Sequence, residues 1–433
     1  MFLNSAKKTI VIAGAGFGGL RAALDLNAAF NKNPALRKDY NLYLIDQNDH
    51  HLFTPSLYEM ATSLYDDARA LELKQAITVP LEKIFKKTDP LRCYQARITA
   101  LDVKTRELKL NDHITLSYNY LMLALGAEVN LYNIPGLKEN ARVIGNLTSA
   151  VKLRNAIEQN FCQHLAAKST LNIIIGGAGV GGVELAGELG GYIRKLKKKY
   201  QARLRVDIIL IEGQKEILPG FHPVMIRWAK ERLKKLGVKI IAGEFISEIK
   251  NSTVLTKSQK EFPFSVLVWS GGIKPNRLTV DLPFKKDAKG RLITNGRFCP
   301  TLTTGEECTH VFVIGDNCCL IDNPTLPQTA QIAIDQGRHA AKAILAGIHP
   351  VRDTISNGVK HKPLPKYRPI PNRYVLPVGG KFALADLGFM RIRGLAAWLL
   401  KETIFLKYLF SILPLPSALA HWFRAVRLFI KND

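Results

Sequence analysis

The sequence predicts an α/β protein with two parallel sheets, because short β-branched runs alternate with helical stretches along most of the chain. Two segments, 8–20 and 171–184, resemble each other, since each reads as a strand, a glycine-rich turn and the beginning of a helix. Further apolar runs lie at 42–45, 120–125, 207–211, 266–269 and 311–314. The repeat is that of a whole domain, so the chain is expected to hold two domains of one type.

The first glycine-rich turn has the spacing of a loop that binds the pyrophosphate of a dinucleotide. Gly14 permits the tight turn, Gly16 lets the backbone approach the phosphates, and Gly19 allows the helix to pack closely on the strand. Asp46 closes the next strand and can accept hydrogen bonds from ribose hydroxyls; it lies 27 residues beyond Gly19 because of a polar insertion near 27–41. This pattern favours a Rossmann-like nucleotide-binding domain over an ordinary turn beside a solvated acid.

The second turn repeats the pattern with Gly177, Gly179 and Gly182, and Glu212 closes the strand that follows. A carboxylate at this place accepts a hydrogen bond from a ribose 2′-hydroxyl and repels a 2′-phosphate, so NADH is preferred over NADPH. Lys215 lies nearby in the sequence and leaves the use of NADPH open. Two dinucleotide sites in one chain suggest that one cofactor is held while the other comes and goes.

Basic residues exceed acidic ones by 61 to 36, which gives the 433 residues a formal net charge of +25. This excess implies an acidic partner, such as nucleic acid, an anionic lipid surface or an anionic substrate. The most basic run, 194–199, falls at the end of a predicted helix and has no interleaved aromatic residues, so we expect no nucleic-acid partner. The apolar fraction of 47% excludes wholesale disorder.

The cysteines and histidines form no pattern typical of a metal site. The six cysteines include no CxxC pair and no cluster with zinc spacing, so neither a metal nor a disulfide framework is expected. The vicinal Cys318 and Cys319 are conceivable as a redox pair, but burial as small residues is the commoner role. His50 and His51 are expected to be structural rather than proton relays.

The end of the chain differs from the rest. Five prolines between 360 and 377 are typical of an extended connector, and residues 351–433 carry 14 Lys and Arg against 4 Asp and Glu. Apolar residues recur at helical spacing over 395–413 and 419–430. Such stripes either pack on a core or lie in the plane of a membrane surface, and the basic flank with its Trp residues favours the membrane. The stretch 394–413 carries three charged residues, so no membrane-spanning helix is expected.

Several segments, in the same order along the chain, resemble those of type II NADH:quinone oxidoreductases. The segment 46–62 resembles the one after the second strand of this family, and 330–337 resembles the start of the helix beneath its isoalloxazine ring. These two segments distinguish the family best from other flavoproteins, because the wider two-dinucleotide-domain flavoprotein superfamily shares the glycine loops and Gly315–Asp316. The segments 120–126 and 269–272 resemble the strands that cross between the domains.

The resemblance implies FAD in the first domain, NADH in the second, and two-electron reduction of a membrane quinone without proton pumping. The residues expected at FAD are Gly14, Gly16, Gly19, Asp46, Ala124, Gly126, Gly315 and Asp316. Those expected at NADH are Gly177, Gly179, Gly182, Glu212 and Gly272.

The NADH domain is expected as an insertion in a split FAD domain, because Gly315 and Asp316 follow it in the sequence. The expected boundaries are 1–147 and 285–359 for the FAD domain, 148–284 for the NADH domain, and 360–433 for a C-terminal membrane-attachment region. The resemblance also implies a peripheral membrane protein on the cytoplasmic face, bound to an anionic lipid surface, and leaves a homodimer open.

Three residues are candidates for catalysis. Glu184 matches a family position near the nicotinamide and the quinone, although a carboxylate in the first turns of a helix is also favoured by the helix dipole alone. Gln331 matches the quinone-proximal signature, whereas Asp335 stands where the family usually has a second Gln. Ser56 likewise stands where the family usually has Leu. Asp335 could supply a proton to the reduced quinone, or it could mean a different acceptor.

Two other activities are compatible with parts of the sequence. A sulfide:quinone oxidoreductase needs a redox-active cysteine pair, for which Cys162 with Cys299 or Cys308 is a weak candidate, and it has no use for Glu212. A flavoprotein like apoptosis-inducing factor would bind NADH with little turnover. Glutathione-reductase-like chemistry is disfavoured, because no cysteine pair lies in the helix after the first loop.

Overall fold

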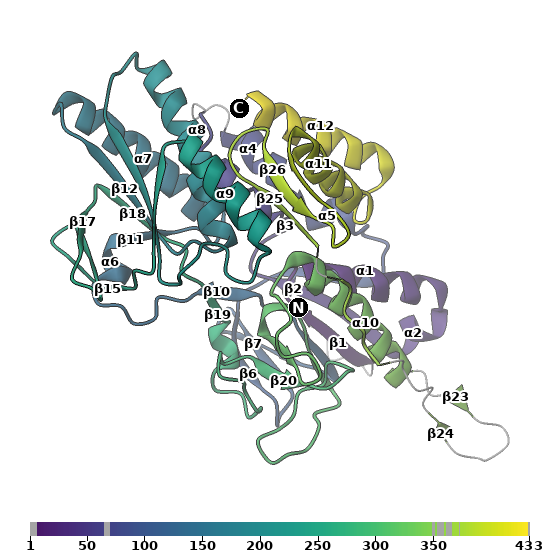
Figure 1. Cartoon of the computed structure of the whole chain (residues 1–433). Helices are drawn as coiled ribbons and strands as arrows, with labels where there is room; N and C mark the ends of the chain where they lie inside the picture. The colour runs from purple at the N-terminus through teal and green to yellow at the C-terminus, as the bar shows by residue number, and fades with distance from the viewer. Residues whose placement is uncertain are drawn as a thin grey trace. The chain divides into compact units, whose positions relative to one another are not determined.

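The computed structural model describes residues 7–64, 70–348, 351–352, 359–360, 366–371 and 373–431 (Figure 1). Its contacts divide the chain into two compact units, each built from segments that are far apart in the sequence. The first unit comprises Met1–Leu52, Val79–Glu128 and Lys274–Ile370, and the second comprises Phe53–Thr78, Val129–Ile273 and Pro371–Asp433. The assignment of FAD and NADH to separate domains with the boundaries given above stays a prediction.

The first unit is built on a parallel sheet of five strands in the order β21-β9-β1-β2-β5. Its central strand is fully buried at Ile10, Val11 and Ile12, as a sheet covered on both faces requires. The main elements are β1 (Lys8–Ala13), α1 (Phe17–Lys32), α2 (Pro34–Asp39), β2 (Tyr40–Asp46), β3 (His50–Leu52), α5 (Leu81–Ile84), β5 (Leu91–Gln95), β6 (Ile98–Asp102), β7 (Glu107–Leu110), β8 (Ile114–Ser117), β9 (Tyr120–Leu123), β20 (Leu292–Thr294), β21 (Val311–Val313), β22 (Cys318–Leu320) and α10 (Ala330–Ile348).

The second unit contains a parallel sheet of the same size, in the order β11-β18-β12-β13-β14. The elements up to residue 269 are η1 (Thr54–Ser56), α3 (Leu57–Ala61), α4 (Ala70–Ile77), α6 (Leu137–Asn140), β11 (Ala141–Val143), α7 (Leu147–Ala166), β12 (Leu171–Gly176), α8 (Val180–Lys199), β13 (Val206–Glu212), α9 (Pro223–Lys235), β14 (Val238–Ala242), β15 (Ile246–Lys250), β16 (Thr253–Thr256), β17 (Glu261–Pro263) and β18 (Val266–Trp269). The strands β4 (Thr78–Pro80), β10 (Ala127–Val129) and β19 (Ile273–Pro275) lie where the chain passes from one unit to the other.

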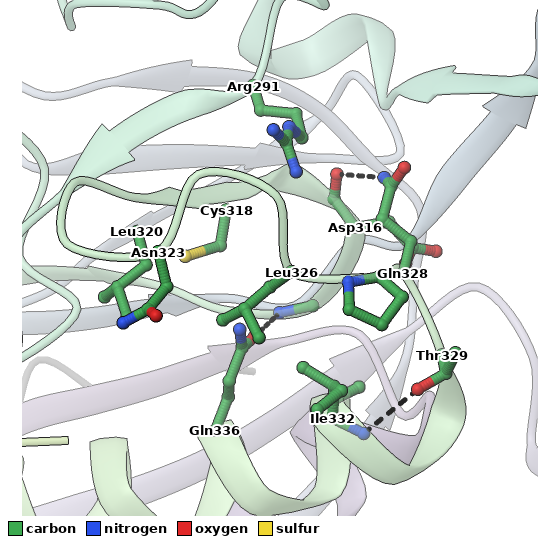
Figure 2. A pocket seen from close by; sticks show the side chains of 13 residues that line it. Arg291, Asp316, Cys318, Leu320, Asn323, Leu326, Gln328, Thr329, Ile332 and Gln336 are labelled. Atoms are coloured by element: carbon green, nitrogen blue, oxygen red, sulfur yellow. Dashed lines mark hydrogen bonds between the residues drawn. The ribbon is translucent and has the colours of Figure 1, made fainter. Parts of the chain in front are cut away.

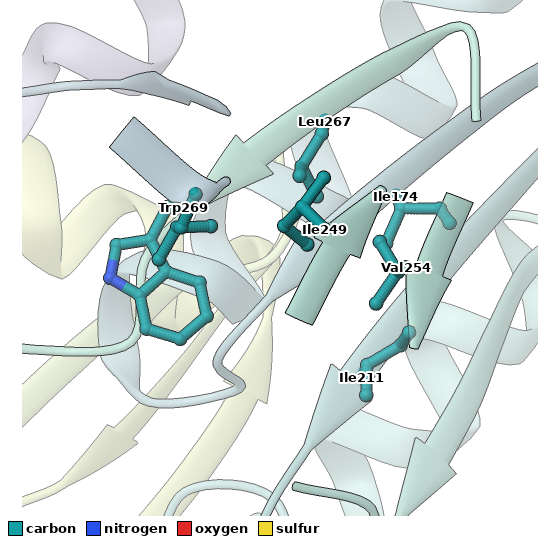
Figure 3. Close-up of a cluster of buried hydrophobic side chains, with 7 residues drawn as sticks. Ile174, Ile211, Ile249, Val254, Leu267 and Trp269 are labelled. Carbon is teal, nitrogen blue, oxygen red and sulfur yellow. The ribbon is translucent and has the colours of Figure 1, made fainter. Parts of the chain in front are cut away.

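A buried apolar cluster joins the second parallel sheet to the antiparallel strands β15 and β16 (Figure 3). Ile174, Ile211 and Leu267 come from neighbouring parallel strands, and Ile249 and Val254 come from the antiparallel layer. The antiparallel strands therefore cover one face of the parallel sheet, which leaves its carboxyl edge for a ligand.

The C-terminal region belongs to the second unit. It contains β25 (Tyr374–Pro377), β26 (Ala383–Asp386) and β27 (Arg391–Gly394), paired antiparallel, followed by α11 (Leu395–Phe410) and α12 (Leu415–Lys431). Parts of the predicted connector 360–377, namely 361–365 and residue 372, lie outside the described residues. Over the residues that are described, no helix is both long and apolar enough to cross a membrane.

These features confirm the predicted fold class of two parallel α/β domains, one in each unit. The strands lie where the apolar runs predict them, because a run buried on both faces has few alternatives to a central parallel strand.

Candidate functional site

The first glycine loop, between β1 and α1, has the geometry that its spacing predicts. Gly14 has φ of +105°, and a Cβ built on it would lie 2.3 Å from the carbonyl oxygen of Ala124. A Cβ on Gly19 would lie 1.9 Å from the carbonyl oxygen of Gly14, so only glycine allows this approach of helix to strand. Gly16 is the N-cap of α1, and no atom lies within 4 Å of its built Cβ. The space at this helix N-terminus therefore suits a pyrophosphate.

Asp46, at the end of β2, is tied to this loop by its carboxylate. One oxygen accepts a hydrogen bond from the N–H of Ala15 at 2.7 Å, and the other accepts from the N–H of Asn48 at 2.8 Å. The carbonyl oxygen of Ala15 in turn accepts from Nδ1 of His51 at 2.8 Å. Burial lowers the pKa of His51 to about 4, so this ring is neutral at physiological pH. In this arrangement His51 supports the loop.

The second glycine loop, between β12 and α8, repeats the first. Gly177 has φ of +95°, and its built Cβ would lie 2.6 Å from Cα of Gly271. A Cβ on Gly182 would lie 1.9 Å from the carbonyl oxygen of Gly177, whereas the N-cap Gly179 again has open space beside it. The two segments that resemble each other in sequence thus form the same turn in both units.

Glu212 holds the place in the second unit that Asp46 holds in the first. Its Oε2 accepts from the N–H of Ala178 at 2.6 Å, and its Oε1 accepts from the N–H of Gln214 at 2.8 Å. In both units the acid therefore bonds to the residue that follows the first glycine of the loop. Oδ2 of Asp46 and both carboxylate oxygens of Glu212 keep a further lone pair, which a ribose hydroxyl can use, whereas Oδ1 of Asp46 also accepts from Nδ2 of Asn48 at 3.1 Å.

A pocket in the first unit lies beside Gly315 and Asp316, just beyond the carboxyl end of β21 (Figure 2). The N–H of Gly315 donates to Oε1 of the buried Gln336 at 2.7 Å, and Nε2 of Gln328 donates to the carbonyl oxygen of Asp316 at 2.8 Å. Burial raises the pKa of the Asp316 carboxyl. Arg291 also lines the pocket. Sequence reasoning missed Arg291, Gln328 and Gln336, because nothing local to them indicates that they meet Gly315 and Asp316.

Ala124 and Gly126 follow β9 at the same edge of the first sheet. The N–H of Ala124 donates to the carbonyl oxygen of Ala13 at 2.9 Å. Nδ2 of the buried Asn317 donates to the carbonyl oxygen of Gly126 at 3.0 Å. The residues predicted to bind FAD are thus brought together at the carboxyl ends of β1, β2, β9 and β21, the edge where parallel sheets bind ligands.

Gln331 and Asp335 lie one turn apart at the start of α10, but they have different surroundings. Gln331 is exposed. The carboxylate of Asp335 accepts a hydrogen bond from the hydroxyl of Tyr367 at 2.9 Å. Burial, strengthened by the neighbouring Asp335, raises the pKa of Tyr367, so its hydroxyl stays protonated and donates. Asp335 therefore has a partner in Tyr367 that the sequence did not indicate.

Glu184 belongs to a group of charged side chains in the second unit, of which Glu184 and Glu402 are buried and Glu59 and Lys401 are half-buried. Lys401, from α11, pairs with Glu59 of α3 and lies 3.2 Å from the carboxylate of Glu402. Burial raises the pKa of Glu184, which is 8% exposed, to about 8, against the opposing charge of Lys401. Burial alone would lower the pKa of Lys401, but Glu59 and Glu402 raise it well above its usual range. At neutral pH the group therefore combines a charged lysine with a Glu184 that is mostly protonated.

Tyr58 lies between this charged group and the second glycine loop. Its hydroxyl oxygen would lie 2.1 Å from a Cβ built on Gly181, and it shares a hydrogen bond with Ser270. Burial, together with Glu184, raises the pKa of Tyr58. Apart from Glu184 itself, the sequence signal for this group is Lys401, because a lysine within an apolar helix needs a carboxylate partner when it is shielded from water.

Gly272 follows β18 beside the second glycine loop. It has φ of +139°, and its carbonyl oxygen accepts from the N–H of Asn130 at 3.0 Å. The carbonyl oxygen of Asn130 accepts from Nε1 of Trp269 at 2.7 Å. The residues predicted to bind NADH therefore also share one sheet edge, at the ends of β12, β13 and β18.

The cysteines are free thiols, and their surroundings do not favour redox chemistry. Sγ of Cys318 lies 3.2 Å from Oγ1 of Thr294, whereas Sγ of Cys319 lies 3.7 Å from a guanidinium nitrogen of Arg291. Burial raises the pKa of Cys318 and of Cys299 to about 12, so both are protonated and poor nucleophiles. Within the described residues, no cluster of His, Cys, Asp and Glu is arranged to hold a metal ion.

Comparison with known proteins agrees with this geometry. A family model described as pyridine nucleotide-disulphide oxidoreductase matches residues 8–337. The type II NADH:quinone oxidoreductase of Staphylococcus aureus is 30% identical over 349 residues, which cover 78% of this chain and 82% of that protein. The Staphylococcus haemolyticus protein of the same name is 29% identical over the same lengths.

Solved structures also share the fold. NDH2 from Plasmodium falciparum, in complex with NADH, superposes with a TM-score of 0.79 at 16% identity and covers 97% of this chain and 98% of its own. The sulfide:quinone oxidoreductase of Aquifex aeolicus has a TM-score of 0.68 at 18% identity, with 93% of this chain and 90% of its own covered.

The repeated loops and strand-end acids account for the match to the broad family, and the identity to the staphylococcal proteins narrows it. The resemblance seen in the sequence is thereby confirmed: this chain belongs to the pyridine nucleotide-disulphide oxidoreductases and, among them, to the type II NADH:quinone oxidoreductases.

Proposed function

We propose that this chain oxidises NADH by means of FAD and passes two electrons to a quinone, without pumping protons. The observation that carries the proposal is the pair of glycine loops, one in each unit, each bonded to a strand-end carboxylate. A chain with two such loops is built for two dinucleotides. When bound, FAD supplies the redox chemistry, since it accepts two electrons as a hydride and can release them to a quinone.

The side chains fit the assignment of FAD to the first unit and NADH to the second. The open space at Gly16 and at Gly179 leaves room for a pyrophosphate at each helix N-terminus. Glu212 lies where it can accept from a 2′-hydroxyl and repel a 2′-phosphate, which favours NADH over NADPH. In the first unit, the pocket beside Asp316 offers polar groups for the ribityl and pyrophosphate parts of FAD.

Glu184 is the group that we assign to proton transfer. Its carboxyl is mostly protonated at neutral pH and can donate a proton to a reduced quinone oxygen. The nearby charge of Lys401 then stabilises the carboxylate that remains. Gln331, exposed on the first turn of α10, can donate a hydrogen bond to the quinone. We assign Asp335 a positioning role, because its carboxylate is held by Tyr367.

A two-step flavin assay tests this function. NADH should bleach the absorbance of the bound flavin, and a soluble quinone analogue should restore it. NADPH should act more weakly, and sulfide, used as the control reductant, should not bleach the flavin. Bleaching by sulfide would support a sulfide:quinone oxidoreductase, whereas a stable charge-transfer complex with slow reoxidation would support an NADH-binding flavoprotein with low turnover.

We also propose that the C-terminal helices attach the protein to an anionic membrane surface on the cytoplasmic side. In the described part of the chain, nine large apolar side chains between 389 and 430 are at least 39% exposed, against seven in all the other described residues. They are Phe389, Met390, Leu395, Leu399, Ile404, Phe410, Leu415, Phe423 and Ile430. Lys407, Arg424 and Arg427 are exposed beside them. Each basic residue near an anionic leaflet adds about 1 kcal/mol to the attraction.

The two faces of the predicted apolar stripe have different roles in this proposal. Trp398, Phe405 and Leu409 of α11 are buried within the second unit, whereas Leu399 and Phe410 of the same helix are exposed. A helix can thus dock on its own protein with one face and offer the other to lipid.

Vesicle binding tests this attachment. Changing Leu399, Phe410 and Phe423 together to Glu should release the protein from vesicles containing phosphatidylglycerol, while the rate with a soluble quinone analogue is retained. Ile321→Glu is the matched control, because Ile321 is 63% exposed in the first unit and Phe423 is 62% exposed. Equal binding to vesicles by the triple variant and the wild type would contradict the proposal. Light scattering of the released protein measures its mass and so tests whether it forms a homodimer.

A further inference from the structure

Phe245 is a large apolar side chain at the carboxyl edge of the second sheet, yet it is 48% exposed. It follows β14, which pairs in parallel with β13 so that Glu212 lies opposite Ala242. The N–H of Glu244 donates to the carbonyl oxygen of Glu212 at 2.9 Å. The backbone that carries Phe245 is therefore bonded directly to the strand-end acid.

Gly213, the residue after Glu212, is where the ring of Phe245 rests. A Cβ built on Gly213 would lie 2.5 Å from the ring atoms Cδ1 and Cε1, so any larger residue there would displace the ring. Nζ of Lys257 lies 5.3 Å from the ring centroid, within the range of a cation–π contact. The N–H of Lys257 also donates to the carbonyl oxygen of Phe245 at 2.8 Å. These contacts hold the ring in place while half of it stays open to solvent.

The order of the strands decides which part of a dinucleotide would meet this ring. The loop after β12 receives the pyrophosphate, and the acid at the end of β13 receives the ribose of the adenosine half. Since β14 is the next strand in the sheet, the base on that ribose extends toward the end of β14. Phe245 is the exposed aromatic ring at that place, and any nucleic base can stack on such a ring.

We propose that Phe245 is the platform on which the adenine of NADH stacks, with Gly213 and Lys257 as the residues that position its ring. The proposal rests on the assignment of NADH to the second unit. It makes Phe245 a binding residue for the adenosine half of the substrate, with no part in the chemistry at the nicotinamide.

The test compares Phe245→Ala with wild-type holoenzyme, using a soluble quinone analogue as acceptor and two reductants. With NADH, KM should rise about tenfold at nearly unchanged kcat, a size typical of a lost base–aromatic stack. With reduced nicotinamide mononucleotide, which lacks the adenosine half, kcat/KM should be the same in both proteins. The inhibition constant of ADP-ribose should rise in Phe245→Ala by the same factor as the KM for NADH. Phe245→Tyr keeps the ring and should keep the KM of the wild type.

Two further variants sharpen the test. Gly213→Ala should raise KM for NADH by displacing the ring, and it should add nothing when combined with Phe245→Ala, because both changes act through one contact. Ile114→Ala is the control, at a side chain that is 44% exposed in the first unit, and it should leave kcat/KM unchanged with both reductants.

An unchanged KM for NADH in Phe245→Ala, or an equal loss with both reductants, would overturn the proposal for Phe245. Additive effects of the two changes would overturn the positioning role of Gly213. A wild-type protein that does not oxidise NADH contradicts the proposed function instead, so the two failures are distinguishable.

Discussion

Lys401 and Glu59, whose side chains are 18% and 14% exposed, form an ion pair in the second unit, although 342 residues separate them in the sequence. The pair ties the C-terminal helix α11 to the short helix α3. Oε2 of Glu59 is buried without a hydrogen-bond partner in the part of the chain that the structure describes, so Lys401 is the main compensation for this carboxylate. Because the charge of Lys401 also acts on Glu184, the C-terminal helix contributes to the electrostatics of the candidate site.

Removing the lysine charge should therefore be costly. We expect Lys401→Met to lower the free energy of unfolding by about 3–5 kcal/mol, because Glu59, which is 14% exposed, and the buried Glu402 would both lose this cation. Lys407→Met, at an exposed position of the same helix, should change it by no more than about 0.5 kcal/mol. Urea unfolding of the two holoenzyme variants measures the difference, and equal effects would mean that the ion pair is not stabilising.

The raised pKa of Glu184 predicts a pH dependence of stability. The usual pKa of this side chain is 4.5, whereas in the folded protein it is about 8. Between these values the folded protein holds a proton that the unfolded chain has released, so the contribution of Glu184 to stability falls as pH rises from about 4.5 to 8. Glu184→Gln removes this fall. The difference in unfolding free energy between Glu184→Gln and the wild type should thus increase from about pH 5 to about pH 8. A difference that stays constant over this range would refute the raised pKa of Glu184.

The same carboxyl predicts a pH dependence of activity. If Glu184 donates a proton to the reduced quinone, kcat should fall as pH rises through about 8, where the carboxyl loses its proton. Glu184→Gln should lower kcat by about 10²–10⁴-fold and abolish this fall. Glu306→Gln, at an exposed position of the first unit, is the control and should keep the wild-type profile. Identical profiles for Glu184→Gln and the wild type would leave Glu184 with a structural role only.

The parts of the site that the sequence predicted are those that depend on local geometry. The spacing of Gly14, Gly16 and Gly19 is a property of one turn, and Asp46 follows the next strand of the same parallel pair. Parallel strands bring such loops and acids to one edge whatever else the fold contains, so the prediction carried over to the second unit unchanged.

The contacts that the sequence did not predict depend on packing between distant segments. The pair of Lys401 with Glu59 and the bond of Tyr367 to Asp335 join elements whose proximity no local pattern encodes. The apolar stripe of α11 shows a related limit, because its periodicity is the same for Trp398, which is buried, and for Leu399, which is exposed. Periodicity predicts a helix, but it does not say which of two apolar faces the protein covers.

Because Asp46 and Glu212 have the same geometry in different units, their charges should be separable by mutation. Asp46→Asn should weaken retention of FAD and leave the KM for NADH of the flavin-loaded fraction unchanged. Glu212→Gln should leave FAD bound and raise the KM for NADH by about tenfold, since a hydrogen bond to a charged group is lost. It should also reduce the preference for NADH over NADPH, because the charge that repels a 2′-phosphate is gone. Flavin absorbance after gel filtration and the ratio of the two KM values measure these effects. If either variant weakened the binding of both FAD and NADH, the assignment of one cofactor to each unit would be contradicted.

Tyr367 and Asp335 offer the last test, because this chain has Asp where its family usually has Gln. Tyr367→Phe removes the hydroxyl that donates to the carboxylate and should lower the free energy of unfolding by about 1.5–3 kcal/mol. Reoxidation of the reduced flavin by a soluble quinone analogue should keep its rate, since the bond positions the segment 366–370 against α10 and does not touch the acceptor. Asp335→Gln should lose similar stability and also keep the reoxidation rate. A slower reoxidation in Asp335→Gln, together with an unchanged rate in Tyr367→Phe, would instead mean that the carboxylate itself serves the quinone.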